Sequence, residues 1–270
     1  MSERFPKTVL TIAGFDPSSG AGITADLKTI SAHGLYGTAC ITSLTVQCTQ
    51  GVRRVQAVSP DLVLETLEAL VEDIPPAAVK IGMLGTGRIA RVVAEFLSKK
   101  RLANVVLDPV LRSSSGKALL DQSGIRVLKQ LLNLVDVVTP NLEEAGVLTG
   151  RTVRRERDME DACRTLARMG ARNAVITGGH LRQPVDVFLG EQADGMAKRY
   201  RHERLATRST HGTGCAYSTA IACNLAKGIS LAGEEPNAIS LAGQYVHAAL
   251  EEAYPIGKGT GPINHLHHRR

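Results

Sequence analysis

The stretch Thr8–Ile30, TVLTIAGFDPSSGAGITADLKTI, contains a strand, a turn and a helix in that order. Its first six residues form an almost continuous aliphatic run, which is typical of a strand buried on both faces of a parallel sheet. The run ends in a segment rich in Gly, Ser and Pro, and a helical pattern begins at Ile23. This order predicts an α/β fold with the turn at the carboxyl edge of the sheet, where open α/β proteins bind ligands.

The same alternation continues along the chain. Four further aliphatic runs are predicted to form buried strands, at 78–83, 104–110, 136–140 and 173–178. Helical patterns are found at 23–30, 59–71, 89–97, 125–132, 214–226 and 239–254. The segment 185–207 differs, because VDVFLG, EQADG and MAKRYRHERLAT indicate two antiparallel strands around a turn. No linker or repeat interrupts this order, so we expect one domain over residues 1–270.

The composition excludes several classes of protein. With 43% hydrophobic and 21% charged residues the chain is not intrinsically disordered, and its 26 glycines follow no collagen repeat. No apolar run approaches the ~18 residues that span a bilayer, and the first residues, MSERFPK, lack the apolar stretch of a signal peptide. We therefore expect a cytoplasmic protein without a membrane partner. Five cysteines without CxxC spacing argue against disulfides and structural zinc. A net charge of +6 favours anionic partners, either nucleic acid or a phosphorylated small molecule.

A second glycine-rich turn, THGTGCA at 210–216, opens directly into a helix of small residues. Gly212 and Gly214 can adopt backbone angles closed to other residues, so the amides from Gly212 through Thr213 to Cys215 can converge on an anion at the positive end of the helix dipole. A phosphoryl group that gains charge during transfer suits such a site. Cys215 is expected to have a favoured thiolate there and is a candidate base. The alternative is a turn that packs the helix closely, with an inert buried cysteine.

Acidic residues also follow predicted strands. Asp16, in the first turn, could hold a polar small molecule, although turn geometry alone would explain its neighbouring glycines. Asp108 and Glu144 follow two other strands at the same edge, where paired carboxylates could bind hydrated Mg²⁺. Asn141 and Glu144 could equally form a helix capping box, and both roles can coexist.

Gln47, in LTVQCTQG, is predicted to follow an apolar strand. A side-chain amide presents an acceptor beside a donor, which could pair with an exocyclic amine and a ring nitrogen of a heterocycle. An ordinary surface glutamine is the alternative, because most glutamines are exposed.

Taken in order, these motifs make the chain similar to the hydroxymethylpyrimidine/phosphomethylpyrimidine kinases of thiamin biosynthesis, a branch of the ribokinase-like superfamily. The matching segments are TIAGFDPSSGAGITADLKT, the Gln47 strand, KIGML, VVLDPV, TPNLEEA, GGHL, STHGTGCAYSTA and GKGTGPINHLH. The resemblance implies a three-layer α/β/α sandwich with a mainly parallel central sheet. It also implies two successive phosphorylations by ATP with Mg²⁺, of 4-amino-5-hydroxymethyl-2-methylpyrimidine and then of its monophosphate.

The resemblance also implies roles for single residues. Gln47 would recognise the aminopyrimidine edge. The other residues on the substrate side would be Ala21, Met83, Val110, Gly14, Asp16 and Asp26. The anion hole would comprise Gly212, Thr213, Gly214 and Cys215, and the Cys215 thiolate would accept the hydroxymethyl proton. Asp108 and Glu144 would organise Mg²⁺, directly or through water. On the nucleotide side would lie Thr177, Asn141 and Lys258.

Two positions depart from the family pattern. Thr177 stands where lysine is common, so it offers the nucleotide phosphates only a hydroxyl. Ser19 stands where glycine is common, and we expect the neighbouring glycines to make this tolerable.

Other features leave competing interpretations. His265, His267 and His268 are expected to lie in an exposed tail, with metal binding as the alternative. The basic run 198–208 is interpreted first as a solvated hairpin, then as an attractor of ATP, and last as a nucleic-acid contact. We expect a homodimer whose partners are the pyrimidine and ATP, without nucleic acid. The rival functions are a pyridoxal kinase of the same superfamily and a non-catalytic pyrimidine-binding or nucleic-acid-associated protein, although the intact acidic and cysteine positions argue against the latter.

Overall fold

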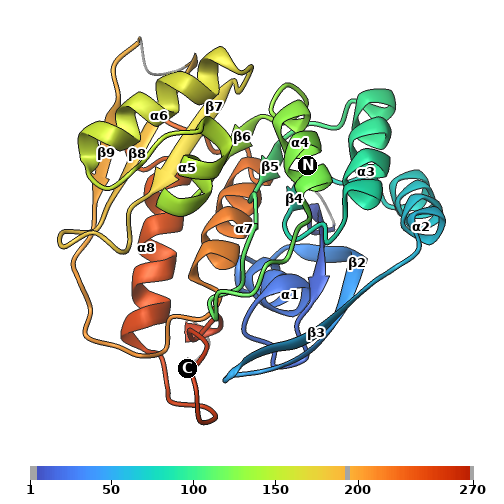
Figure 1. The fold of residues 1–270 in the computed structure, drawn as a ribbon, viewed down its shortest axis with the longest axis horizontal. Coiled ribbons are helices and arrows are strands. Elements are labelled where there is room, and N and C mark those ends of the chain that lie inside the picture. The colour runs from blue at the N-terminus through green and yellow to red at the C-terminus, as the bar shows by residue number, and fades with distance from the viewer. Residues whose placement is uncertain (1–4, 192–194, 268–270) are drawn as a thin grey trace.

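A computed structural model describes residues 5–191 and 195–267, and Figure 1 shows their arrangement. The strands are β1 (Thr8–Phe15), β2 (Tyr36–Cys48), β3 (Gly51–Ala57), β4 (Ala78–Ile81), β5 (Val105–Leu107), β6 (Val137–Val138), β7 (Asn173–Thr177), β8 (Val185–Gly190) and β9 (Lys198–Arg201). The helices are α1 (Gly22–Ala32), α2 (Pro60–Asp73), α3 (Gly87–Lys100), α4 (Gln122–Leu131), α5 (Leu142–Thr149), α6 (Glu156–Arg168), α7 (Thr213–Ala226) and α8 (Ala238–Glu251). The aliphatic runs predicted as strands correspond to β1, β4, β5, β6 and β7, which confirms the alternation.

The described strands form one nine-stranded sheet in the order β3-β2-β1-β4-β5-β6-β7-β8-β9. Pairing is parallel from β2 to β7 and antiparallel at both edges. The hairpin predicted for 185–207 is confirmed as β8 and β9, and residues 192–194 of its turn lie outside the described residues. The antiparallel ribbon of β2 and β3 was not predicted, and Gln47 lies inside β2 instead of after it.

Helices cover both faces of the sheet, which confirms the three-layer α/β/α architecture (Figure 1). On one face α7 packs against both α1 and α8, and on the other α3 packs between α2 and α4. Aliphatic side chains fill the space between the layers, so the core needs no tryptophan and few aromatic rings.

The carboxyl edge of the parallel strands positions the site. Because β1, β4, β5, β6 and β7 run in one direction, the loops that follow them leave the sheet at one edge. Asp16, Met83, Asp108 and Thr177 therefore all lie at or just beyond that edge.

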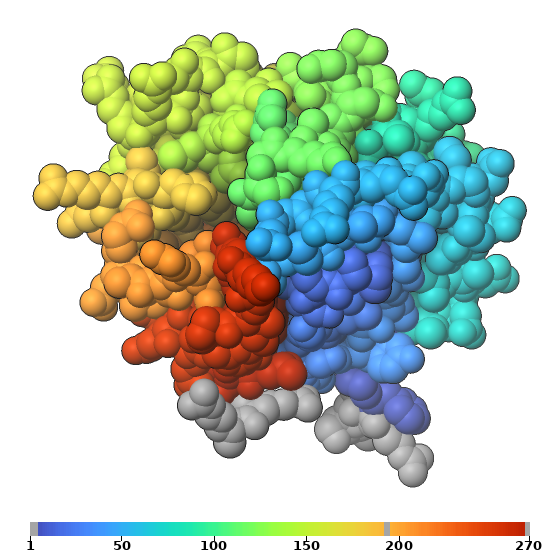
Figure 2. Space-filling view, turned by 60° about the horizontal axis from the view of Figure 1, so that its bottom comes forward, coloured from blue at the N-terminus to red at the C-terminus, as the bar shows by residue number. Residues whose placement is uncertain are grey.

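The expectation of an exposed histidine tail is wrong for His265 and His267, which are both buried. The Tyr245 hydroxyl donates to the His265 carbonyl at 2.7 Å, and the His267 ring lies 5.1 Å from the Tyr245 ring. Burial lowers the pKa of His265 to about 4, so this ring is neutral. In Figure 2 this C-terminal part (red) lies against the N-terminal part (blue), and His268 lies outside the described residues.

The basic run 198–208 lies on an exposed face, and α6 balances part of its charge. Arg199 and Arg201 form ion pairs with Glu160 and Glu156, at 2.8 and 3.0 Å. Because these side chains are partly exposed to solvent, which screens their charges, the pairs add little stability, as expected of a solvated hairpin. In the described part of the chain, no helix is both long and apolar enough to cross a membrane.

Candidate active site

The turn before α7 packs directly on the turn after β1. Gly212 has φ of +86°, and a Cβ at this position would lie 1.8 Å from the carbonyl oxygen of Gly20, so only glycine fits. Since α7 begins at Thr213, the N–H groups of Gly214 and Cys215 have no acceptor four residues earlier within the helix. These amides and the positive end of the helix dipole provide the features of an anion site.

Cys215 lies in the first turn of α7 and keeps part of its residue surface exposed, whereas its thiol is enclosed by protein atoms and faces the backbone N–H of Gly22. Burial raises the pKa of the thiol to about 12, and the charge of Lys80 and the Gly22 N–H offset this only partly. The expectation of a favoured thiolate is therefore wrong for the ligand-free site. Loss of hydration, together with the charges of Asp108 and Asp26, outweighs the effect of the helix terminus.

Lys80 is a site residue that the sequence analysis missed. It is fully buried in β4, and its Nζ lies 3.0 Å from both carboxylate oxygens of Asp26 and 3.9 Å from Asp108 Oδ2. Although burial alone would lower it, the pKa of Lys80 is raised by these carboxylates, so the side chain remains a cation. The available signal was a lysine inside the apolar strand AVKIGM, because lysine is almost never fully buried without a partner.

Asp26 does not face a substrate, which corrects its assignment to the substrate side. It is completely buried and also accepts hydrogen bonds from the hydroxyls of Thr11 at 2.6 Å and Thr219 at 2.9 Å. Asp26 therefore holds Lys80 from behind the site.

Asp108 and Glu144 are both nearly buried at the sheet edge. Burial and the neighbouring charge of Asp108 raise the pKa of Glu144 to about 8, and burial also raises the pKa of Asp108, against the opposing effect of Lys80. Glu144 accepts from the N–H of Asn141 at 3.0 Å and of Leu111 at 3.4 Å, so the predicted capping box is present. The described residues contain no cluster of three or more His, Cys, Asp or Glu side chains that could hold a metal. Asp108 and Glu144 nevertheless suit Mg²⁺. They offer carboxylate oxygens, a cation between them would favour the ionised form of both, and Mg²⁺ can take its remaining ligands from water.

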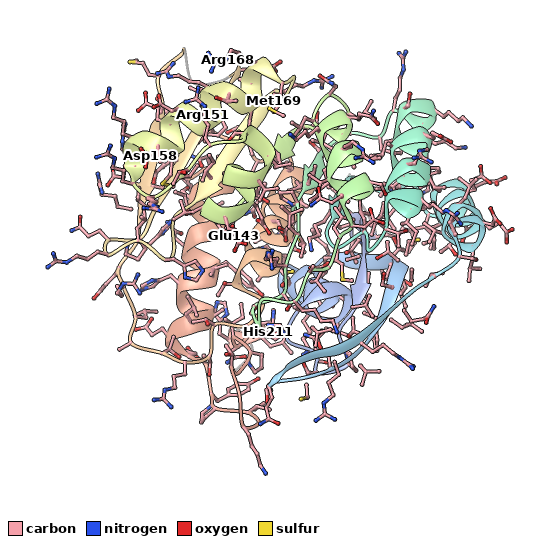
Figure 3. All side chains as sticks on the ribbon, viewed as in Figure 1. Glu143, Arg151, Asp158, Arg168, Met169 and His211 are labelled. Atoms are coloured by element: carbon pink, nitrogen blue, oxygen red, sulfur yellow. The ribbon has the colours of Figure 1, made fainter. Side chains whose placement is uncertain are left out.

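Gln47 and Asp16 meet at His211, in the turn before α7. His211 Nε2 lies 2.8 Å from Asp16 Oδ2 and 3.2 Å from the side-chain nitrogen of Gln47. Its Nδ1 lies 3.3 Å from the hydroxyl of Ser114, in the loop between β5 and α4, and Figure 3 shows His211 beside this loop and the β2–β3 ribbon. His211 was noted in the sequence only as part of a motif, without a role.

Of the other substrate-side positions, Gly14, Met83 and Ala21 lie at the turn after β1. Met83 covers Gly14, since a Cβ at Gly14 would lie 2.8 Å from the Met83 sulfur. Ala21 donates its N–H to Asp16 at 3.0 Å, so this backbone group is already engaged. Val110 is partly exposed, two residues beyond Asp108.

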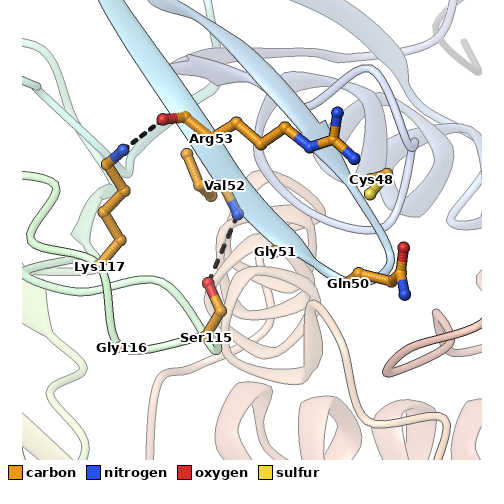
Figure 4. Close-up of a pocket in the computed structure, with 8 residues that line it drawn as sticks. All are labelled: Cys48, Gln50, Gly51, Val52, Arg53, Ser115, Gly116 and Lys117. Carbon is orange, nitrogen blue, oxygen red and sulfur yellow. Dashed lines mark hydrogen bonds between the residues drawn. The ribbon is translucent and has the colours of Figure 1, made fainter.

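A cavity of about 140 Å³ lies next to Gln47 and His211, and its wall also includes Ser114 and Thr260. A second hollow of about 460 Å³ shares Cys48, Gly51 and Ser115 with this cavity, and it lies between the end of the β2–β3 ribbon and the loop 115–117 (Figure 4). Lys117 Nζ donates to the Arg53 carbonyl at 2.5 Å across this hollow. The larger hollow contains neither Cys215 nor the carboxylates, so we interpret it as the outer end of the Gln47 cavity.

Only two of the three nucleotide-side residues lie together. Thr177 donates its N–H to Pro140 at 2.9 Å and pairs with Asn141 in a parallel bridge. Lys258 is exposed in a loop whose next residues bond to Thr49, with Gly259 N–H at 3.2 Å from its hydroxyl and Thr260 N–H at 3.0 Å from its carbonyl. That loop borders the Gln47 cavity.

Comparisons with known proteins agree with this arrangement. A family model described as phosphomethylpyrimidine kinase matches residues 16–264. The chain is 39% identical over 268 residues to the hydroxymethylpyrimidine/phosphomethylpyrimidine kinase of Haemophilus influenzae, covering 98% of each chain. It is 42% identical over 267 residues to the thiamine biosynthesis bifunctional protein ThiED of Geobacter sulfurreducens, covering 97% of this chain and about half (53%) of that longer protein.

A solved structure of Bacillus subtilis pyridoxal kinase in complex with ADP is also similar. It has a TM-score of 0.88 and 34% sequence identity, and the match covers 98% of this chain and 99% of that one. The neighbour is a kinase, and the fold and the sequence place this chain among kinases as well. The chain belongs to the phosphomethylpyrimidine kinase family.

Proposed function

We propose that this kinase transfers the γ-phosphoryl group of ATP to the hydroxyl of 4-amino-5-hydroxymethyl-2-methylpyrimidine, and then phosphorylates the monophosphate to the diphosphate, in thiamin biosynthesis. The observation that carries the proposal is the turn 16–22. At one end, Asp16 bonds His211 beside Gln47, and at the other, the Gly22 N–H faces Cys215. This one turn thus contacts both the neighbourhood of the proposed ring-recognising amide and the start of α7, where a phosphoryl group would be held.

Cys215 is the proposed proton acceptor. Its sulfur would take the proton of the substrate hydroxyl as that oxygen attacks the phosphoryl group, while the amides of Gly214 and Cys215 stabilise the charge that develops on the phosphoryl oxygens. Because its pKa is raised to about 12, only a small fraction of thiolate exists before ligands bind. Lys80 is the buried cation that lowers the free energy of this thiolate, and Asp26 keeps Lys80 in place.

Asp108 and Glu144 are the proposed magnesium-organising pair. Both are oxygen donors, both are nearly buried, and each disfavours ionisation of the other in the absence of a cation, so the residues fit Mg²⁺. The bound ion supplies positive charge next to the transferring phosphoryl group. The capping bonds of Glu144 to Asn141 and Leu111 leave fewer of its lone pairs free, which favours a contact through water.

On the nucleotide side, the proposal assigns Thr177 and Asn141 to contacts with ATP, supported by their adjacency at the sheet edge. The loop that contains Lys258 borders the Gln47 cavity through Gly259 and Thr260, so we assign Lys258 to the outer rim of the site. The remaining parts of the proposal are a single kinase domain over 1–270 that works as a homodimer in the cytoplasm, without a nucleic-acid partner.

Pyridoxal kinase is the second candidate function, favoured by the likeness to the Bacillus subtilis pyridoxal kinase structure. A substrate panel separates the candidates. Formation of phosphorylated product is measured with MgATP and the hydroxymethylpyrimidine, its monophosphate or pyridoxal, each over a range of concentrations. The proposal predicts the higher kcat/KM for the two pyrimidines. A higher kcat/KM for pyridoxal would replace the substrate assignment, and no product from any of the three would overturn the proposed function.

A further inference from the structure

The hydrogen bonds around Gln47 contain an inconsistency that determines how its amide is oriented. In the structure, the amide nitrogen faces His211 Nε2 and the amide oxygen faces Thr45 Oγ1, each at 3.2 Å. Whether these contacts are hydrogen bonds depends on where His211 and Thr45 carry their hydrogens. The nitrogen and oxygen ends of a glutamine amide exchange places by a rotation of 180°, so the surrounding donors and acceptors decide between the two orientations.

Asp16 fixes the hydrogen on His211. One oxygen of Asp16 accepts from the N–H and the hydroxyl of Ser18, at 2.8 and 2.7 Å, and the other accepts from the N–H of Ala21 at 3.0 Å. Burial opposes ionisation, but hydrogen bonds from His211 and Ser18 lower the pKa of Asp16, so it is a carboxylate and can only accept. His211 Nε2, at 2.8 Å from Asp16, must therefore carry a hydrogen. This single N–H is donated mainly to Asp16, and an amide nitrogen of Gln47 facing it would place donor against donor. The amide oxygen suits this position, because it can share the same hydrogen in a three-centre bond.

Thr45 leads independently to the same orientation. Its hydroxyl has one hydrogen, which it donates to the carbonyl oxygen of Phe15 at 2.9 Å. With that hydrogen used, Thr45 Oγ1 can only accept from Gln47, so the amide atom facing it has to be the nitrogen. Rotation of the amide by 180° makes the Thr45 contact a hydrogen bond and the His211 contact the longer branch of a hydrogen bond that His211 shares with Asp16. It leaves one acceptor position on the oxygen and one hydrogen on the nitrogen for a ligand.

We infer that His211, held by Asp16, and Thr45 fix the amide of Gln47 in one orientation, and that this orientation selects 4-aminopyrimidine rings over their 4-oxo counterparts. The inference rests on the proposed function and specifies its substrate class. A 4-amino ring presents an amine hydrogen beside an unprotonated ring nitrogen, which complements a fixed acceptor and donor. A 4-oxo ring presents a carbonyl beside a ring N–H, so the same pose places like groups together, and an amide free to rotate would accept both. His211 and Thr45 are thus positioning residues that act through Gln47.

The test compares two substrates, 5-hydroxymethyl-2-methylpyrimidine with a 4-amino or a 4-oxo group. Thr45→Val removes the hydroxyl with little change of shape, and Thr45→Ser is the matched control that keeps it. His211→Leu removes the ring N–H, and His211→Gln restores a side-chain N–H. The ratio of kcat/KM for the amino ring to that for the oxo ring should fall about tenfold in Thr45→Val, the size expected for one lost hydrogen bond. It should fall about fivefold in His211→Leu, which loses only a shared bond. The change should fall on KM, because Gln47 contacts the ring edge and not the reacting hydroxyl. Thr45→Ser and His211→Gln should keep the ratio within about twofold of the wild type.

The outcomes separate the inference from the function on which it rests. A wild-type protein that phosphorylates neither ring overturns both. If the wild type is active, two results would overturn the inference alone. One is a Thr45→Val variant with the wild-type ratio of kcat/KM for the amino and oxo rings, and the other is an equal fall of this ratio in Thr45→Val and Thr45→Ser. A His211→Leu protein that does not unfold in one cooperative transition is not natively folded. In that case the comparison of Thr45→Val with Thr45→Ser decides the result. Calorimetric dissociation constants of the two rings without ATP should follow the same pattern.

Discussion

Replacing Lys80 by Met should destabilise the protein strongly, because it leaves Asp26 buried without its cation. The side chains of both residues are fully buried, and Lys80 Nζ bonds both oxygens of Asp26 at 3.0 Å, so solvent does not screen the pair. Without Lys80, Asp26 can become neutral by taking up a proton. For an aspartic acid of ordinary pKa that costs about 4 kcal/mol at pH 7, which agrees with the ~3–5 kcal/mol typical of a broken buried ion pair.

The assay is urea denaturation of wild type and Lys80→Met at several pH values. Protonation becomes less costly as pH falls, so the loss of unfolding free energy should decrease from about 4 kcal/mol at pH 7 to about 1.5 kcal/mol at pH 5. Asp26→Asn in the Lys80→Met background should recover part of the loss, since the double variant contains no unpaired charge at these two positions.

A small and pH-independent loss would refute this reasoning. If Lys80→Met cost less than about 1 kcal/mol at pH 7, or if its cost were equal at pH 5, the ion pair would contribute no more than an exposed one.

Three further predictions concern the site and its turns. Iodoacetamide should leave Cys215 almost unmodified at pH 7, as measured by peptide-resolved mass spectrometry, and should react faster as the pH approaches the thiol pKa of about 12. Rapid labelling at neutral pH would contradict the effect that we assign to burial. Without Mg²⁺, stability should fall as pH rises from about 4.5 to about 8, because folded Glu144 keeps its proton over that range. Mg²⁺ should therefore raise the melting temperature more at pH 8 than at pH 6, and a Glu144→Gln variant that kept this difference would exclude Glu144 as its source. Ser19→Gly should raise the free energy of unfolding by about 1 kcal/mol, since Ser19 has φ of +63°, and a less stable variant in urea would show that Ser19 makes compensating contacts.

The central strands and the position of the site were predictable because both depend on local pattern. Parallel strands buried on both faces must be aliphatic along their length, and the loops after them must leave at one edge, so the turns at 16–22 and 210–216 were found from sequence. The β2–β3 ribbon was missed because its polar residues, such as Arg53 and Arg54, interrupt the apolar pattern that marks a strand.

The network behind these turns was not predictable, because it depends on contacts between distant segments. Lys80 meets Asp26 across 54 residues and His211 meets Asp16 across 195 residues, and no local rule assigns such partners. Cys215 illustrates a different limit. The helix terminus that favours a thiolate is visible in sequence, whereas the burial that disfavours it is known only once the helix is packed.

The central claim, that Cys215 accepts the substrate proton, is tested most directly by kcat for hydroxymethylpyrimidine phosphorylation in Cys215→Ala. Cys223→Ala is the matched control, since Cys223 is buried farther along the same helix, outside the proposed site. The account predicts that Cys215→Ala lowers kcat by about 100-fold or more, as expected for loss of a general base, with KM nearly unchanged, while Cys223→Ala retains activity. A kcat for Cys215→Ala within about twofold of the control would contradict it.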